Sequence, residues 1–275
     1  MIAAAGDIAC DPDSASFNDG RGGPDNCRQM ATSDLLLGIK PTAILTLGDN
    51  QYDEASFAQF LRAFEPSWGR FKRRIFPVVG NHEYLTPRAA GFCRYFGAVA
   101  HCDHGSYYSF DLGSWHIVAL NSQCPYVGGC GRGSPQETWL RADLAAHHNL
   151  CTLAYWHEPR WTSSRYGNAG QMAAIWSDVV AARADVVLSA HNHLYERFVP
   201  LDAAGRPARA GVREFVVGTG GSSHYDLREP PRPGERARNA RTFGVLKLTL
   251  RGGRYDWRFV PVGSGFADSG SSRCR

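Results

Sequence analysis

The chain lacks the uninterrupted apolar run of about 20 residues that a membrane-spanning helix needs. It also lacks a strong charge of either sign, since its 275 residues carry a formal net charge of only +4 and the basic residues are spread out. The densest basic cluster, Arg70 with Lys72–Arg74, is typical of a solvated surface beside a strand. The sequence therefore predicts no membrane span and indicates no nucleic-acid partner, and it leaves the oligomeric state open.

No internal repeat and no interdomain linker divides the chain, so we expect a single domain over residues 1–275. No CxxC pair is present, which argues against a zinc knuckle or a redox site. The cysteines are even in number, namely Cys10, Cys27, Cys93, Cys102, Cys124, Cys130, Cys151 and Cys274. Because so many cysteines are unusual in a reducing cytosol, we expect disulfides and a secreted or periplasmic protein.

Eight cysteines allow 105 pairings, and the sequence alone does not decide among them. The pairing we expect joins chain neighbours that close short loops, namely Cys10–Cys27, Cys93–Cys102 and Cys124–Cys130. This leaves Cys151 to pair with Cys274. Met1 stands directly before the apolar segment Ile2–Ala5, so we expect the mature form of a protein whose leader has been removed.

Short apolar segments alternate with amphipathic ones, which is typical of an α/β protein. Strands are expected at Ile2–Ala5, Ala43–Leu47, Ile75–Val79, His116–Leu120, Cys151–Trp156, Val186–Ser189 and Glu214–Val217. A closing hairpin is expected from Phe243–Leu250 and Tyr255–Val262.

Helices are expected after two capping-box patterns, Ser56–Gln59 and Ser134–Glu137. The apolar spacing within Gln171–Ala182 predicts a third helix. The segment Arg228–Arg241 is rich in Pro, Arg and Glu, and it predicts an exposed loop.

Five polar motifs directly follow five of the expected strands. They are Gly6-Asp7, Gly48-Asp49-Asn50-Gln51-Tyr52, Gly80-Asn81-His82-Glu83, His157 and His191-Asn192-His193. Ligands of α/β sheets bind at the C-terminal ends of strands, and a glycine before Asp or Asn permits a sharp turn. Each motif alone is typical of a turn, but together they predict one shared cleft.

The residue types in this cleft indicate phosphate-ester chemistry. Hydrolysis of a phosphate ester requires a strong nucleophile near neutral pH and positive charge for the phosphoryl oxygens, and two metal ions about 4 Å apart supply both. A carboxylate such as Asp49 can bridge two ions. A mixed set of Asp, Asn, His and Tyr favours transition metals.

These motifs, in this order, resemble those of the calcineurin-like metallophosphoesterases. Tyr52, three residues after Asp49, resembles the purple acid phosphatase branch. The likeness extends to His193–Arg197 and to Gly265–Gly270, which are similar to bacterial members. We do not expect the separate N-terminal β-domain of the plant enzymes. The likeness implies a four-layer αββα sandwich of two mixed β-sheets flanked by helices.

The resemblance also implies a dinuclear metal site. The first ion, Fe(III), would be held by Asp7, Asp49, Tyr52 and His193. The second, Zn, Mn or Fe(II), would be held by Asp49, Asn81, His157 and His191. A metal-bound hydroxide would attack the phosphorus of a small phosphate monoester. His82 would act as a general acid or stabilise the phosphoryl oxygens.

Four positions depart from the pattern of bacterial relatives. Glu158 and Tyr166 stand where those relatives often carry histidine. Ala190 and Asn192 stand where they usually carry glycine and aspartate. No expected ligand is lost, so the departures concern the surroundings of the substrate. The candidate substrate-contacting residues are Asn50, Arg160, Arg165, Tyr166 and His224.

Two other functions compete with the phosphomonoesterase. One is a phosphodiesterase that uses the same metal site to act on nucleotides or lipid headgroups, and the sequence separates it poorly from a monoesterase. The other is a non-catalytic protein that binds phosphate or metal. The complete set of expected ligands together with His82 argues against the second alternative, because a decayed enzyme would be expected to lose at least one of them.

Overall fold

The chain, seen here in a computed structural model that describes residues 1–228 and 230–275, contains two mixed β-sheets. The first sheet has the order β13 (Ser269–Arg273), β12 (Arg254–Pro261), β11 (Gly244–Arg251), β1 (Ile2–Ala5), β2 (Ala43–Leu47) and β3 (Ile75–Val78). The second has the order β10 (Glu235–Asn239), β8 (Tyr195–Phe198), β9 (Arg213–Val217), β7 (Val186–Ser189), β6 (Cys151–Tyr155), β5 (Trp115–Ala119) and β4 (Tyr108–Leu112).

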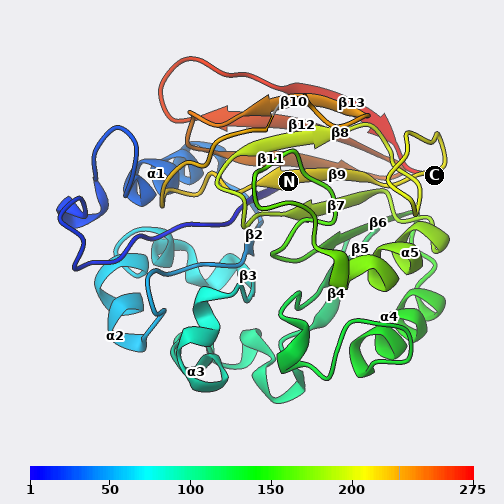
Figure 1. Ribbon diagram of the computed structural model, residues 1–275, viewed down its shortest axis with the longest axis horizontal. Helices are drawn as coiled ribbons and strands as arrows, with labels where there is room; N and C mark the ends of the chain where they lie inside the picture. The colour runs from blue at the N-terminus through cyan, green and yellow to red at the C-terminus, as the bar shows by residue number, and fades with distance from the viewer. Residues whose placement is uncertain (229) are drawn as a thin grey trace.

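Helices lie on both outer sides of the paired sheets (Figure 1). One side carries α1 (Gln29–Ile39), α2 (Phe57–Gln59) and α3 (Ala90–Phe96), and the other carries α4 (Pro135–Ala146) and α5 (Ala173–Ala181). The predicted four-layer αββα sandwich is therefore confirmed. Among the described residues, no helix is long and apolar enough to cross a membrane.

The central strands β6 and β7 of the second sheet are buried on both faces, and successive side chains point to opposite sides of a strand. In β6, Leu153 and Tyr155 belong to the core between the sheets. Ala154 of the same strand packs in a separate core with Leu140 of α4 and Trp176 of α5. This explains why these strands read as continuous apolar runs in the sequence.

The predicted strands all form, with ends shifted by at most one residue. Four further strands escaped the sequence analysis, namely β4, β8, β10 and β13. The prediction of a loop over Arg228–Arg241 is wrong in part, because β10 lies within it; Glu229 lies outside the described residues. β10 and β13 are both edge strands of polar sequence. An edge strand needs no continuous apolar face, so apolar periodicity does not reveal it.

The two capping boxes differ in the structure. At Ser56 both halves form, but the α-helix is short and continues as a π-helical turn over Phe60–Phe64. At Ser134 the hydroxyl accepts from the backbone N–H of Glu137, whereas the Glu137 carboxylate accepts from the N–H of Gly133, 2.8 Å away, so the reciprocal bond is absent. The third predicted helix begins at Ala173, two residues later than expected.

The structure contains the four disulfides that the sequence analysis expects, namely Cys10–Cys27, Cys93–Cys102, Cys124–Cys130 and Cys151–Cys274. The last joins the start of β6 to the chain just past β13, and so links the two sheets.

We predict that the long-range disulfide contributes most to stability. Its cysteines are 123 residues apart, against 6 for Cys124–Cys130. On the chain-entropy model, this corresponds to about 5 and about 2 kcal/mol of the free energy of unfolding. Replacing Cys151 and Cys274 by Ala should therefore lower the urea midpoint more than replacing Cys124 and Cys130. Equal losses in the two double variants would contradict this prediction.

Candidate metal centre

The five polar motifs meet because the C-terminal ends of two sets of parallel strands face each other. In the first sheet β1, β2 and β3 run parallel, and in the second β6 and β7 do. The polar residues lie two or three positions past the ends of these strands: Asp7 after β1, Asp49 after β2, Asn81 after β3, His157 after β6 and His191 after β7. Each sheet thus supplies part of one cluster, which with Tyr52 and His193 we call the ligand cluster.

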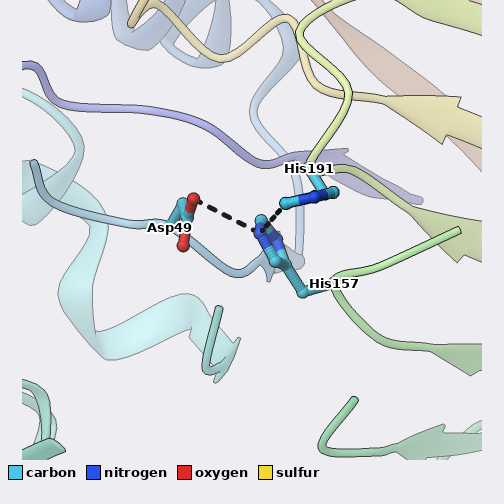
Figure 2. Close-up of side chains that lie close together, drawn as sticks. All are labelled: Asp49, His157 and His191. Atoms are coloured by element: carbon cyan, nitrogen blue, oxygen red, sulfur yellow. Dashed lines mark hydrogen bonds and ion pairs between the residues drawn. The ribbon is translucent and has the colours of Figure 1, made fainter. Parts of the chain in front are cut away.

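Asp49 lies at the middle of the ligand cluster. Its Oδ2 is 2.9 Å from the Tyr52 hydroxyl and 3.3 Å from His157 Nε2. Figure 2 shows the His157 ring between Asp49 and His191, and His191 Nδ1 is 3.2 Å from His157 Nε2. The Asn81 amide oxygen is also 3.2 Å from His157 Nε2. One carboxylate of the first sheet thus contacts both halves of the cluster.

The Tyr52 hydroxyl shows that the cluster suits cations. Its oxygen lies 2.8 Å from Asp7 Oδ1, 2.9 Å from Asp49 Oδ2 and 3.0 Å from His193 Nε2. The phenol has one hydrogen for two carboxylate oxygens, and His193 Nε2 can donate or accept according to its tautomer. The other Asp7 oxygen is buried and has no hydrogen-bond partner. Carboxylate, phenol and amide oxygens lie close together here with imidazole nitrogens and few protons to share. Such a donor set fits metal ions.

The electrostatics of the cluster lead to the same conclusion. Burial would by itself raise the pKa of Asp49, but the neighbouring imidazoles, His157 foremost, hold it well below its usual range. Burial, followed by the charges of Asp49 and Asp7, raises the pKa of the Tyr52 phenol. A bound metal ion would be the largest local charge and would reverse the second shift, so that the phenolate is favoured.

Two glycines allow the motifs to approach this closely. Gly48 has φ +86°, and a Cβ there would lie 2.6 Å from His157 Nδ1. A Cβ at Gly80 would lie 2.1 Å from Asp49 Oδ1. A side chain at Gly48 would therefore displace His157, and one at Gly80 would displace Asp49.

The model of a known family, described as calcineurin-like phosphoesterase, matches residues 2–195, which include the whole ligand cluster. The chain belongs to this family. Purple acid phosphatase 21 of Arabidopsis thaliana is 34% identical over 192 residues, which cover 66% of this chain and 42% of that protein. Purple acid phosphatase 22 of the same plant is 26% identical over 218 residues, which cover 69% and 49%.

The chain thus spans less than half the length of these two relatives. A solved structure of purple acid phosphatase PPD1 from yellow lupin (Lupinus luteus) seeds is similar in fold, with a TM-score of 0.75 at 16% identity. The match covers 98% of this chain and 53% of that one. The relatives confirm the resemblance to the purple acid phosphatase branch of the calcineurin-like phosphoesterases.

In this calcineurin-like phosphoesterase, the buried carboxylate of Glu83 fixes the loops that follow β2 and β3 and carry Asp49 and Asn81. It accepts hydrogen bonds from the backbone N–H of Gly80 at 2.6 Å, of Asn50 at 2.7 Å and of Asp49 at 3.0 Å. Burial raises the pKa of Glu83 to about 7. Asn50, expected at the substrate, is fully buried and donates to Val78 O at 3.0 Å, so it lies beneath the cluster and not on its open side.

His82 lies at the edge of the cluster with 23% of its side chain exposed. Its Nδ1 is 2.6 Å from the Asp53 carbonyl oxygen and 3.1 Å from Asp53 Oδ1. Its Nε2 is 4.0 Å from Asp49 Oδ2, and its ring is 4.3 Å from the Tyr52 ring. One ring nitrogen is therefore fixed by Asp53, and the other faces the cluster.

Of the other candidate substrate-contacting residues, Tyr166, with Arg165 against it, lies near His191, whereas Arg160 and His224 pack on aromatic rings. The Tyr166 ring is 6.2 Å from the His191 ring, and Arg165 contacts Tyr166. The Arg160 guanidinium instead lies 3.8 Å over the ring of Trp161, its neighbour in the chain. His224 stacks on Phe243 at 3.9 Å, and burial lowers its pKa to about 4.

Two residues that the sequence analysis missed contact His193. Ser223 Oγ is 2.7 Å from His193 Nδ1, and the Tyr225 ring stacks on His193 at 3.9 Å with an angle of 8°. Both follow β9, whose existence the sequence did predict. They lie six and eight residues past the end of that strand, so closeness to a strand end does not single them out.

The loop that carries Arg165 and Tyr166 is anchored from below by Glu214 of β9. The Glu214 carboxylate is fully buried and accepts from the backbone N–H groups of Arg160 and Trp161, both at 2.9 Å. It also accepts from Ser189 Oγ at 3.2 Å. No ion pair compensates its charge within the described residues, and burial raises its pKa from 4.5 to about 8.

We predict that Glu214 makes stability fall as the pH rises. A carboxyl whose pKa is raised by folding stabilises the fold while it is protonated, and this contribution is lost between its unfolded and folded pKa. The free energy of unfolding should therefore fall by a few kcal/mol as the pH rises from 4.5 to about 8. Glu214→Gln, which cannot ionise, should flatten that slope in urea unfolding. The control is Glu54→Gln at an exposed position, and equal slopes in both variants would contradict the prediction.

Proposed function

We propose that this chain is a metal-dependent phosphoesterase that uses two metal ions to hydrolyse phosphate monoesters. The observation that carries the proposal is the Tyr52 hydroxyl, which lies within 3.0 Å of Asp7, Asp49 and His193 at once. Cations shared among these oxygens would stabilise such crowding. Membership of the calcineurin-like phosphoesterase family supports a phosphate ester as the substrate.

Two groups of residues would hold the ions. Asp7, Asp49, Tyr52 and His193 would hold Fe(III). Asp49, Asn81, His157 and His191 would hold Zn, Mn or Fe(II). The contacts support this division, because Asp7, Tyr52 and His193 meet on one side of Asp49, and Asn81 and His191 meet at His157. When bound, the ions supply positive charge for the phosphoryl oxygens and lower the pKa of water.

His82 would supply the proton for the leaving alcohol. With Nδ1 donating to the Asp53 carbonyl oxygen, the proton to be transferred sits on Nε2, the nitrogen that faces the cluster. The Asp53 carboxylate, 3.1 Å from Nδ1, stabilises the imidazolium that carries both protons. His82 would also lie close enough to the substrate to stabilise a phosphoryl oxygen.

The substrate class and the location of the protein belong to the same proposal. A small phosphate ester suits a cluster that opens to solvent beside His82. Four disulfides and no free cysteine among the described residues support a secreted or periplasmic protein.

Hydrolysis of p-nitrophenyl phosphate and of bis-p-nitrophenyl phosphate by the metal-loaded chain tests the function. We expect a higher kcat/KM for the monoester. A higher value for the diester would favour the phosphodiesterase, and no turnover of either ester at any metal loading would leave the non-catalytic alternative.

We predict that replacing Asp49 abolishes metal binding, whereas replacing His82 mainly lowers kcat. Asp49→Ala should lose both ions, because Asp49 contacts both halves of the cluster. His82→Ala should keep both ions and lose about 10²–10⁴-fold in kcat, the usual contribution of a general acid. Metal analysis of the purified variants and steady-state kinetics provide the measurements. Two ions retained in Asp49→Ala would refute the bridging role.

We predict that the iron-loaded protein is purple or pink through charge transfer from the Tyr52 phenolate to Fe(III). Tyr52→Phe keeps the ring and removes the oxygen, so the visible absorption band should disappear. The matched control is Tyr84→Phe, because the Tyr84 hydroxyl bonds Asn121 and not the cluster. An unchanged band in Tyr52→Phe would show that another group colours the iron.

A further inference from the structure

We propose that Tyr225, Tyr166 and Arg165 form a subsite for a planar aromatic group in the alcohol part of the substrate. We call these three residues the tyrosine wall. The inference rests on the proposed phosphomonoesterase function and narrows its substrate class to esters that carry an aromatic ring.

The tyrosine wall adjoins both groups of proposed metal ligands. The Tyr225 ring lies parallel to that of His193, 3.9 Å away, and its backbone N–H donates to His193 O at 3.0 Å. The Tyr166 ring is 4.8 Å from that of Tyr225 and 6.2 Å from that of His191. A phosphoryl group bound between the two ions would therefore hold its ester substituent within reach of these rings.

The wall presents faces on which a ring can stack. Tyr166 is 52% exposed, so part of its ring is open to a ligand. The Arg165 guanidinium lies 4.9 Å from the Tyr166 ring centroid and 5.5 Å from that of Tyr225. Its Nη2 donates to the Tyr166 hydroxyl at 2.8 Å. A planar guanidinium and two phenol rings are the groups on which aromatic ligands stack.

The backbone beneath the wall is held in place from two sides. Ser164 pairs with Leu227 in a short antiparallel bridge, and the N–H of Arg228 donates to Ser163 O at 2.9 Å. The buried carboxylate of Glu196 accepts from the N–H of Ser163 and from the Thr162 hydroxyl, both at 2.6 Å. A wall fixed before the ligand arrives loses little entropy on binding, so its contacts contribute more fully to affinity.

An aromatic group matches this surface better than an aliphatic or a cationic one. An aliphatic group would gain only the burial of its surface, whereas a planar ring adds stacking on the wall. A cationic headgroup would meet the Arg165 charge, and the nearby carboxylate of Asp226 is already 3.6 Å from Arg241. Aryl rings and nucleobases share the required π-face, so esters of both kinds are needed to test the wall.

The test compares benzyl phosphate with cyclohexylmethyl phosphate, whose alcohols are alike in size but differ in their π-face. We expect the wild-type protein to favour benzyl phosphate in kcat/KM, and Tyr166→Ala to lower that preference about fivefold. Tyr166→Phe, which keeps the ring, should retain the preference. The control is Tyr126→Ala, because Tyr126 is 57% exposed but stacks on Tyr84 and not on the wall.

A binding measurement separates affinity from turnover. Calorimetric titration with benzylphosphonate and cyclohexylmethylphosphonate should show the same preference in Kd and the same loss in Tyr166→Ala. In the kinetic assay, the pair adenosine monophosphate and ribose phosphate provides the nucleobase arm. A loss of preference in either pair supports the wall and tells which kind of ring it accepts.

Two results would overturn the inference. One is an unchanged preference in Tyr166→Ala for both pairs while hydrolysis persists, which would leave the phosphomonoesterase standing without the wall. The other is an equal change in Tyr126→Ala, which would show that the effect is not specific to the wall. Absence of hydrolysis in the metal-loaded wild type would refute the proposed function itself, and the inference with it.

Discussion

The negative charge buried where the two sheets meet is the constraint on which the rest of the structure depends. Asp7 is fully buried and Asp49 is 2% exposed, and both carboxylates face the same phenol oxygen of Tyr52. Burying carboxylates this way costs several kcal/mol unless cations or hydrogen bonds compensate them. Imidazoles from the opposite sheet supply part of that compensation. The arrangement is therefore an anionic cluster that bound cations would stabilise further.

Buried glutamates fix the loops around this pocket. Glu83 bonds backbone N–H groups of the loops after β2 and β3. Glu214 and Glu196 do the same for the loop after β6. A carboxylate can accept from several N–H groups at once, so one side chain sets the course of a whole turn. Reactive groups on loops keep their geometry only when such second contacts support them.

Much of this could be predicted from the sequence because the decisive residues directly follow buried parallel strands. Ile2–Ala5 and Val186–Ser189 are recognisable as strands because they are short and almost wholly apolar. The residues that come next in the sequence must then lie at the C-terminal ends of these strands. The polar edge strands β10 and β13 carry no such signal. Tyr225 was missed for a different reason: it lies eight residues past the end of β9, and only the packing of its ring on His193 gives it a place in the site. Asn50 shows the reverse error, since adjacency to Asp49 says nothing about which way its side chain points.

This contrast separates the two tasks of the site. The ligand cluster is built from strand ends of both sheets, where glycines and buried glutamates leave little freedom, so its chemistry is tied to the fold. The tyrosine wall is built from loop residues that contact the cluster through ring stacking and one backbone hydrogen bond, from Tyr225 N–H to His193 O. Loops tolerate substitution more readily than strands, and Tyr166 is 52% exposed with its ring 6.2 Å from that of His191. If the proposed metal site and subsite hold, substrate preference would change in this fold without a change in the metal chemistry, because the two depend on different parts of the chain.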